Sequence, residues 1–85
     1  MIVIGKEDTR LTRYLDITGT SNVAYYEIGK AFIEVCFNGT TRSYRYSYEK
    51  AGRVHVENMK RLARSGHGLN GYINRYARFL YDEEM

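Results

Sequence analysis

The chain has 85 residues, no proline and one cysteine, with 44% hydrophobic and 27% charged residues. This length holds one small domain and excludes a multidomain enzyme, and the composition is that of a folded globule and not of a disordered segment. The net charge of +3 is unevenly spread, because residues 42–64 hold seven basic side chains against two acidic ones. This basic part attracts phosphate groups, although a solvated basic face without a ligand is the plainer alternative.

The hydrophobic residues are distributed as in a protein without a membrane span. No run approaches the roughly 18 apolar residues that a spanning helix needs, and the apolar start at residues 1–4 is too short for a signal peptide. Cys36 has no second cysteine to pair with, which is typical of a reducing compartment. We therefore expect a cytoplasmic protein, and its small core favours a homo-oligomer.

Residues 1–20 have no clear pattern, since residues 1–4 fit an edge strand and residues 9–16 fit either a short helix or a strand. Beyond them lie three runs rich in β-branched and aromatic residues: 22–28, 31–37 and 42–48. The separators Gly29-Lys30 and Asn38-Gly39-Thr40-Thr41 are hairpin signals, with glycine expected first in a type II′ turn and Asn-Gly in a type I′ turn. The pattern predicts a three-stranded antiparallel meander.

Loop length assigns the two faces of this sheet. A two-residue loop pairs Tyr26 with Ile33, and a loop of two or four residues after Phe37 keeps alternate residues on one side. The core face is then expected to hold Ala24, Tyr26, Ile28, Ile33, Val35, Phe37, Arg42, Tyr44, Tyr46 and Tyr48. On the opposite face, Glu27 and Glu34 are placed to accept from Arg45.

From residue 49 the hydrophobic period becomes helical. One helix is expected over residues 51–65, with Val56, Met59, Leu62 and Ala63 on its inner face. A second is expected over residues 70–81, with an inner stripe of Leu69, Tyr72, Ile73, Tyr76 and Leu80. The sequence therefore predicts an α+β fold in which two helices pack on one sheet face. Its parts are an N-terminal segment (1–20), the domain (21–81) and an acidic tail (82–85).

The corner between the two helices is the most suggestive binding site. Glycines before a helix let backbone N–H groups converge on an anion, and the alternative is a plain corner with glycine caps. Arginines flank the corner. Tyrosines interleaved with arginines can stack a base, and the alternative is that these tyrosines close the core instead. The predicted ligand-binding residues are Ser65, Gly66, His67, Gly68, Asn70, Arg42, Arg45, Arg61, Arg64, Arg75, Tyr46 and Tyr76.

Catalytic and metal chemistry are disfavoured by the spacing. Ser65 and His67 have no acidic residue near them in the chain, so a triad would need a carboxylate from elsewhere in the fold. His55, His67 and Cys36 do not form a metal-binding spacing. We predict a protein that is not an enzyme and has no cofactor or metal, with nucleotide hydrolysis by His67 as a minor alternative.

Four stretches carry a family resemblance: Ser21-Asn22-Val23, residues 32–39, Tyr44-Arg45-Tyr46 and residues 63–76. The most specific series is matched by Ala63, Ser65, Gly66 or Gly68, Asn70, Ile73 and Tyr76. Together they resemble the KTSC domain, which is named for its occurrence at the C-terminus of some lysyl-tRNA synthetases and is also found as small bacterial and phage proteins. The family's Val-Pro step is missing here, where Tyr48-Glu49-Lys50-Ala51 stands. The resemblance implies a compact α+β domain and an RNA-binding role.

Two functions are therefore predicted. The first is a non-enzymatic module that binds a phosphate-bearing ligand, either nucleic acid or a small nucleotide, and can sequester it by binding. The alternative is a phage-type accessory protein that binds and inhibits a host defence protein in the host cytoplasm, with tyrosines as anchors. The acidic end Asp82-Glu83-Glu84 and the mixed sheet face are compatible with this alternative.

Overall fold

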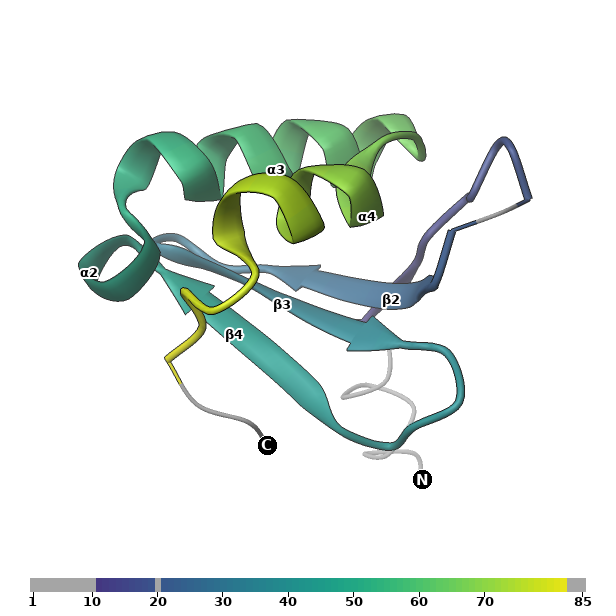
Figure 1. Ribbon diagram of the computed structural model, residues 1–85, viewed down its shortest axis with the longest axis horizontal. Coiled ribbons are helices and arrows are strands. Elements are labelled where there is room, and N and C mark those ends of the chain that lie inside the picture. The colour runs from purple at the N-terminus through teal and green to yellow at the C-terminus, as the bar shows by residue number, and fades with distance from the viewer. Residues whose placement is uncertain (1–10, 20, 83–85) are drawn as a thin grey trace, which may run out of the picture.

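The computed structural model describes residues 11–19 and 21–82. The elements are β1 (Thr12–Arg13), β2 (Val23–Ile28), β3 (Phe32–Phe37), β4 (Ser43–Ser47), α2 (Tyr48–Ala51), α3 (Arg53–Ser65), α4 (Leu69–Tyr72) and the π-helix η1 (Ile73–Ala77). The strands form an antiparallel sheet in the order β1-β2-β3-β4, and the helices pack on one of its faces (Figure 1). The α+β class is confirmed, whereas the predicted three strands and two helices are too few.

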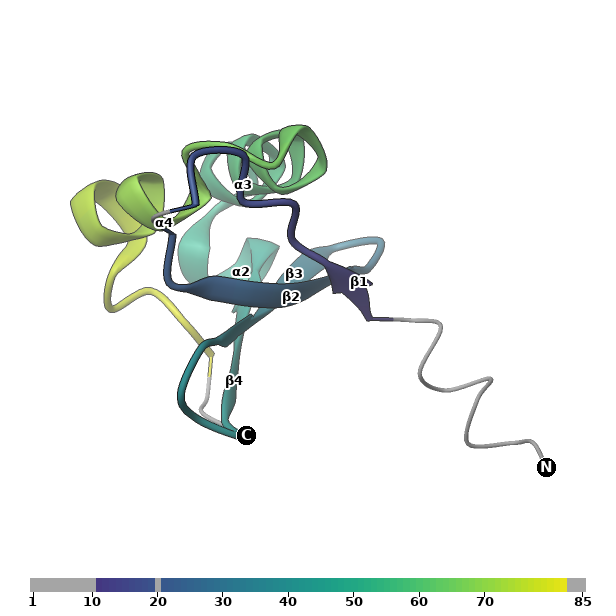
Figure 2. The same ribbon diagram turned by 90° about the vertical axis from the view of Figure 1, so that its right-hand side faces the viewer.

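The fourth strand belongs to the N-terminal segment. Thr12 pairs with Tyr26 and Arg13 with Tyr25, so β1 is a two-residue edge strand beside β2. After β1 the chain rises from the sheet to the helical layer (Figure 2), where the Ile17 N–H donates to the Gly66 carbonyl at 2.9 Å. Of the alternatives for residues 9–16, the described part contains the two-residue strand β1 and no helix, and the edge strand expected at residues 1–4 lies outside the described residues.

The first hairpin keeps the predicted faces with a different register. Ile28 pairs with Ile33 and Tyr26 with Val35, which is two residues further along β3 than expected. Because side chains alternate with a period of two, a shift by two residues leaves each one on its predicted side. The core face was therefore predicted correctly over most of β2 and β3.

The register differs because Gly29 is not a residue of the turn itself. The Gly29 N–H donates to the Phe32 carbonyl at 2.9 Å, so the two loop residues are Lys30 and Ala31. The φ of Gly29 is not positive, and the type II′ turn expected there was wrong. Glycine is needed for another reason, since a Cβ at this position would lie 2.0 Å from the Phe32 ring.

A β-bulge between Val23 and Tyr25 reverses the alternation at the start of β2. Val23 is consequently buried, while Ala24 is only half-buried. The expectation that Ala24 faces the core was wrong, because an inserted residue in a bulge changes which side chains point inward.

The second hairpin keeps the predicted faces, but its turn is not the expected type I′, because Asn38 does not have the positive φ that such a turn requires. Tyr44 pairs with Val35 and Tyr46 with Ile33, and Tyr46 is only 2% exposed. Arg45 lies on the opposite face, where its guanidinium forms a 3.0 Å ion pair with Glu34. The expected pairing of Arg45 with Glu34 is confirmed, and so is the view that these tyrosines close the core.

The first predicted helix is divided at Gly52. This residue has φ +94 and separates the short α2 from α3. The inner face of α3 buries Val56, Met59 and Ala63 as expected. Lys60 of α3 is also buried, and its Nζ donates to the Lys30 carbonyl at 3.2 Å.

The second predicted helix ends four residues early, at Ala77. The chain then turns so that the Tyr81 ring packs edge-on against Tyr44, with centroids 4.9 Å apart. Ala77 is buried in η1, whereas Tyr76, expected on the inner stripe, is 53% exposed. The π-helical turn, a feature frequent at functional sites, thus coincides with an outward-facing aromatic side chain.

The acidic end begins as part of the fold. The Asp82 carboxylate accepts from the Ser47 hydroxyl at 2.6 Å, and the Asp82 N–H donates to the Arg45 carbonyl at 2.6 Å. The rest of the predicted tail lies outside the described residues. No helix within the described ranges is long and apolar enough to cross a membrane.

Candidate functional site

The predicted anion-binding corner is a closed connection between α3 and α4. Gly66 and Gly68 both have positive φ, which fits their predicted role as left-handed caps. The Gly66 N–H donates to the carbonyls of Leu62 and Ala63, at 3.0 and 3.2 Å, and the His67 N–H donates to Leu62 at 3.4 Å. These two backbone donors therefore complete the end of α3 and are not directed at a ligand.

Two side chains also form hydrogen bonds with backbone groups of the corner. The Ser65 hydroxyl donates to the Leu62 carbonyl at 2.9 Å, and the buried Tyr14 hydroxyl accepts the Leu69 N–H at 3.2 Å. Tyr14 comes from the N-terminal segment, which the sequence left without a pattern, so its role could not be foreseen. The hydroxyl of Ser65 and the N–H of Leu69 thus have structural partners.

Replacing Tyr14 with phenylalanine is expected to lower the free energy of unfolding by about 1–3 kcal/mol, because the Leu69 N–H loses its acceptor in a buried place. Urea denaturation followed by circular dichroism measures this change. Tyr25→Phe on the open sheet face is the matched control, expected to stay within about 0.5 kcal/mol of the parent. An unchanged midpoint for Tyr14→Phe would mean that water replaces the hydroxyl.

The five predicted arginines do not share one pocket. Arg45 lies on the sheet face that the helices leave open, whereas Arg61 and Arg64 belong to α3 and Arg75 to η1. Arg42 is exposed just before β4. The structure therefore separates Arg45 from the arginines of the helical layer by the thickness of the sheet, and the expected convergence of all five is wrong.

Tyr46, predicted as a stacking residue, is a core residue. Its ring packs edge-on to Tyr81 at 6.3 Å, and burial is the main cause that raises the pKa of its hydroxyl to about 12. A ring enclosed in this way cannot stack a nucleobase on its face. Tyr76, the other predicted stacking residue, is the one that solvent reaches.

An aromatic cluster joins α3 to η1 around Tyr76. The Nδ1 of His55 lies 2.7 Å from the Tyr72 hydroxyl, and the His55 ring lies near-parallel to the Tyr76 ring, at 6.2 Å and 22°. The Tyr72 and Tyr76 rings are 4.9 Å apart. These contacts hold an exposed tyrosine ring in a defined orientation.

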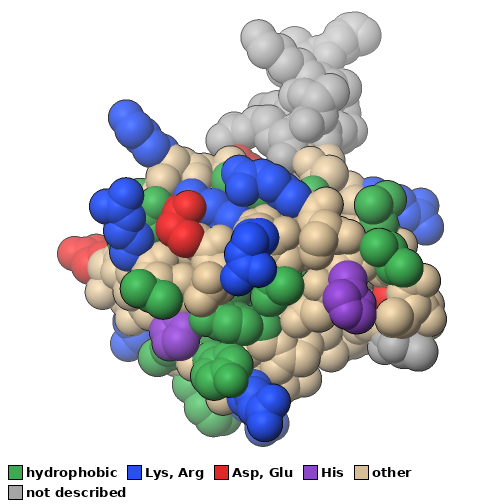
Figure 3. All heavy atoms as spheres, turned by 90° about the horizontal axis from the view of Figure 1, so that it is seen from above, with side chains coloured by type: hydrophobic (Ala, Val, Ile, Leu, Met, Phe, Trp, Pro, Cys, Tyr) green, Lys and Arg blue, Asp and Glu red, His purple; other side chains and the backbone are tan. Residues whose placement is uncertain are grey.

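Arginines lie at both ends of this cluster. The Arg75 guanidinium lies 5.9 Å from the centroid of the Tyr76 ring. Arg61 donates to the Asn58 side-chain oxygen at 3.0 Å, and the Asn58 amide donates to the Tyr72 hydroxyl at 3.1 Å. We call this connected group the cation–aromatic surface: His55, Asn58, Arg61, Tyr72, Arg75 and Tyr76. In the view onto the helical layer, basic and hydrophobic side chains lie side by side (Figure 3).

For nucleotide hydrolysis, the minor alternative, the candidate group is His67. His67 lines a pocket of about 310 Å³ together with Asp16, Thr18 and Ser21, so the fold does bring a carboxylate to this histidine. That carboxylate also accepts the Ser21 N–H at 3.0 Å and thereby holds the chain turn. The pocket has no lysine or arginine among its lining residues, which makes it a poor place for a phosphate.

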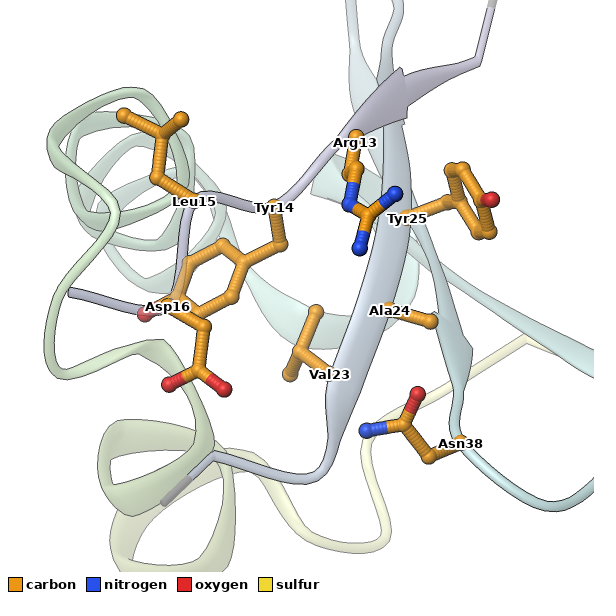
Figure 4. Close-up of a pocket in the computed structure, with 8 residues that line it drawn as sticks. All are labelled: Arg13, Tyr14, Leu15, Asp16, Val23, Ala24, Tyr25 and Asn38. Atoms are coloured by element: carbon orange, nitrogen blue, oxygen red, sulfur yellow. The ribbon is translucent and has the colours of Figure 1, made fainter. Parts of the chain in front are cut away.

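A neighbouring pocket of about 300 Å³ lies between the N-terminal segment and the sheet (Figure 4). Arg13 and Asp16 both line it, so its charges are of opposite sign. Tyr14 points from this segment into the space between the helices and Val23 (Figure 4). The pocket thus lies beside the buried Tyr14, and its lining has no excess of positive charge.

Metal binding and thiol chemistry receive little support. Among the residues that the structure describes, no group of three or more His, Cys, Asp or Glu side chains could hold a metal ion. Burial, followed by the charges of Glu34 and Glu27, raises the pKa of the Cys36 thiol. A protonated thiol is a weak nucleophile at neutral pH, as expected for a packing residue.

Comparisons with family models, curated proteins and solved structures find no match for this chain. The resemblance to the KTSC domain therefore stays a prediction. A function has to be argued from the chain's own surface, on which Arg61, Arg75 and Tyr76 are the predicted residues that the fold brings into one connected group.

Proposed function

We propose that this protein is a non-enzymatic module that binds single-stranded nucleic acid through its cation–aromatic surface. The observation that carries the proposal is the half-exposed Tyr76 ring, which lies 6.2 Å from the His55 ring and 5.9 Å from the Arg75 guanidinium. A fixed, exposed ring can stack a base of any sequence, since every base has a flat π-face. Duplex bases are already stacked on one another, which favours a single strand as the partner.

The charge of the surface supports the same ligand. Arg61 and Arg75 form no ion pair with any described residue, so both guanidinium groups are available to phosphates. The Arg61 group is also held by Asn58, which reduces the entropy lost when it binds. Cations close to a stacking ring supply the two kinds of contact, to phosphates and to bases, that a single strand needs.

The test is a titration of fluorescein-labelled dT8 followed by anisotropy at several salt concentrations. Arg61→Ala/Arg75→Ala is expected to reduce the slope of log affinity against log salt by about 1.4, since each phosphate contact in a single strand contributes about 0.7. Tyr76→Ala is expected to weaken binding by about 1–3 kcal/mol, which is roughly fivefold to 150-fold, because one stacking platform is lost.

Tyr25→Ala serves as the matched control, since Tyr25 is a comparably exposed tyrosine on the open face of the sheet. It should leave the affinity for dT8 unchanged, and thermal melting confirms that all variants are folded. The proposal fails if the parent protein does not bind dT8 at low salt, or if Tyr25→Ala weakens binding as much as Tyr76→Ala.

A host-protein partner is the second candidate. Leu15 and Ile17 are large apolar side chains, 70% and 67% exposed, on the segment that crosses the end of α3. Exposed apolar groups of this kind occur at protein interfaces. Such binding would survive high salt, because apolar contacts are not screened, and would be weakened by Leu15→Ser/Ile17→Ser and not by the arginine variants.

A further inference from the structure

A third pocket, of about 450 Å³, lies where η1 and the residues after it face the β3–β4 hairpin. Most of the side chains that line it are amides or aromatic rings. Four of the five asparagines in the chain border it, namely Asn22, Asn38, Asn70 and Asn74. They come from three parts of the chain, before β2, after β3 and in the α4–η1 segment, and the fold brings these parts together.

The amide groups of this pocket are available to a ligand. The side chains of Asn22, Asn70 and Asn74 form no hydrogen bond with any other residue that the structure describes. Asn38 has only a long contact, 3.5 Å from its Nδ2 to the Ser21 carbonyl. Each amide offers donors and an acceptor, which is what recognition of the edge of a nucleobase requires.

The aromatic rings of the pocket are packed against one another on one side, whereas the ring at its opening is exposed. Tyr44 packs edge-on against Phe37 at 5.7 Å and against Tyr81 at 4.9 Å. Phe79, which is 73% exposed, also lines the pocket, and the Arg78 guanidinium lies 5.3 Å from the centroid of its ring. A planar ligand can thus lie against aromatic rings with a cation at the mouth.

The pocket adjoins the cation–aromatic surface. Asn74, Arg78 and Phe79 also line a groove of about 340 Å³ whose other lining residues include Arg75 and Tyr76. A strand stacked on Tyr76 would therefore run past the mouth of the amide-lined pocket. The two features lie on the two sides of one short segment, residues 74–79.

We infer that this pocket takes one unpaired base of the bound strand and gives the protein a preference among bases. The asparagine amides pair with the edge of that base, Phe79 covers its face, and Arg78 neutralises the adjoining phosphate. The inference rests on the proposed function, because the strand must first be held by the cation–aromatic surface.

The experiment compares dA8, dC8 and dT8 by anisotropy and then follows the best of them by ¹⁵N NMR. The parent protein is expected to bind one octamer at least fivefold more tightly than another, and Asn74→Ala is expected to reduce that ratio to less than twofold. The side-chain amide signals of the four pocket asparagines should shift on binding. Phe79→Ala should weaken the preferred octamer fivefold or more, whereas Val54→Ala, a comparably exposed apolar position on α3, should not.

Each failure points to a different error. If no octamer binds, the proposed function is wrong and this inference goes with it. If all three octamers bind equally, or if only the Asn58 amide shifts while the pocket amides do not, the surface binds nucleic acid and the pocket does not take a base. A base preference that persists in both Asn74→Ala and Phe79→Ala would overturn the inference in the same way.

Discussion

Tyr46→Ala is expected to lower the free energy of unfolding by about 3–5 kcal/mol, the cost of truncating a large aromatic side chain in a core. Tyr46 stands in β4 opposite Ile33 and is enclosed by the helical layer, with only 2% of its surface exposed. A domain of this size has a total stability of about 4–13 kcal/mol, so the loss is a large share of the total and would leave the variant largely unfolded if the parent lies near the lower end of this range. Chemical denaturation of parent and variant, followed by circular dichroism, measures the loss.

Tyr46→Phe is the control, because it keeps the ring and removes only the hydroxyl. The pKa of Tyr46 is raised to about 12 in the folded state, chiefly by burial, so the folded state favours the neutral phenol. Its contribution is therefore fully present below pH 10 and is lost as the pH rises from 10 through 12. Tyr46→Phe should lose less stability over that interval than the parent. An alanine variant as stable as the phenylalanine variant would contradict this account of the core.

Gly66→Ala is expected to cost about 2–4 kcal/mol for two separate reasons. Gly66 has φ +74, a conformation that is strained for alanine, and an added Cβ would lie 2.6 Å from the Leu15 Cβ. Its carbonyl also accepts the Ile17 N–H, so a displaced Gly66 disturbs the crossing of the N-terminal segment over the helical corner. Thermal and urea denaturation give the size of the effect.

Gly39→Ala separates the two causes. Gly39 has φ +81 but no atom within 4 Å of the position that a Cβ would take, so this variant measures backbone strain alone, about 1–2 kcal/mol. Gly66→Ala should be clearly worse, and the excess should shrink in a Leu15→Gly background, where the contacted Cβ is absent. Equal losses for the two glycine variants would show that the contact with Leu15 relaxes freely.

The corner illustrates how a correct local prediction can mislead about function. The glycines of residues 66–68 do cap α3 in the left-handed conformation, as their position in the sequence indicates. Three backbone donors of the corner nevertheless have partners within the chain, Gly66 and His67 in the last carbonyls of α3 and Leu69 in the Tyr14 hydroxyl. A helix end needs partners for its free backbone groups, and here the chain itself provides them.

The amino-acid sequence by itself determined the three main strands, their faces and the two main helical segments, since these follow from side-chain periods of 2 and 3.6 that are local properties of the chain. It also predicted that Arg45 meets Glu34 and that Tyr46 lies on the core face, because a register shift by two residues leaves each side chain on the same face.

Only the tertiary structure decided the rest. It turned Tyr76 outward in η1 and gathered asparagines from three parts of the chain around one pocket. The bulge at the start of β2 and the hydrogen bond between Tyr14 and Leu69 were also decided only by the tertiary structure. These features depend on which segments meet across the fold, and no local period encodes such contacts.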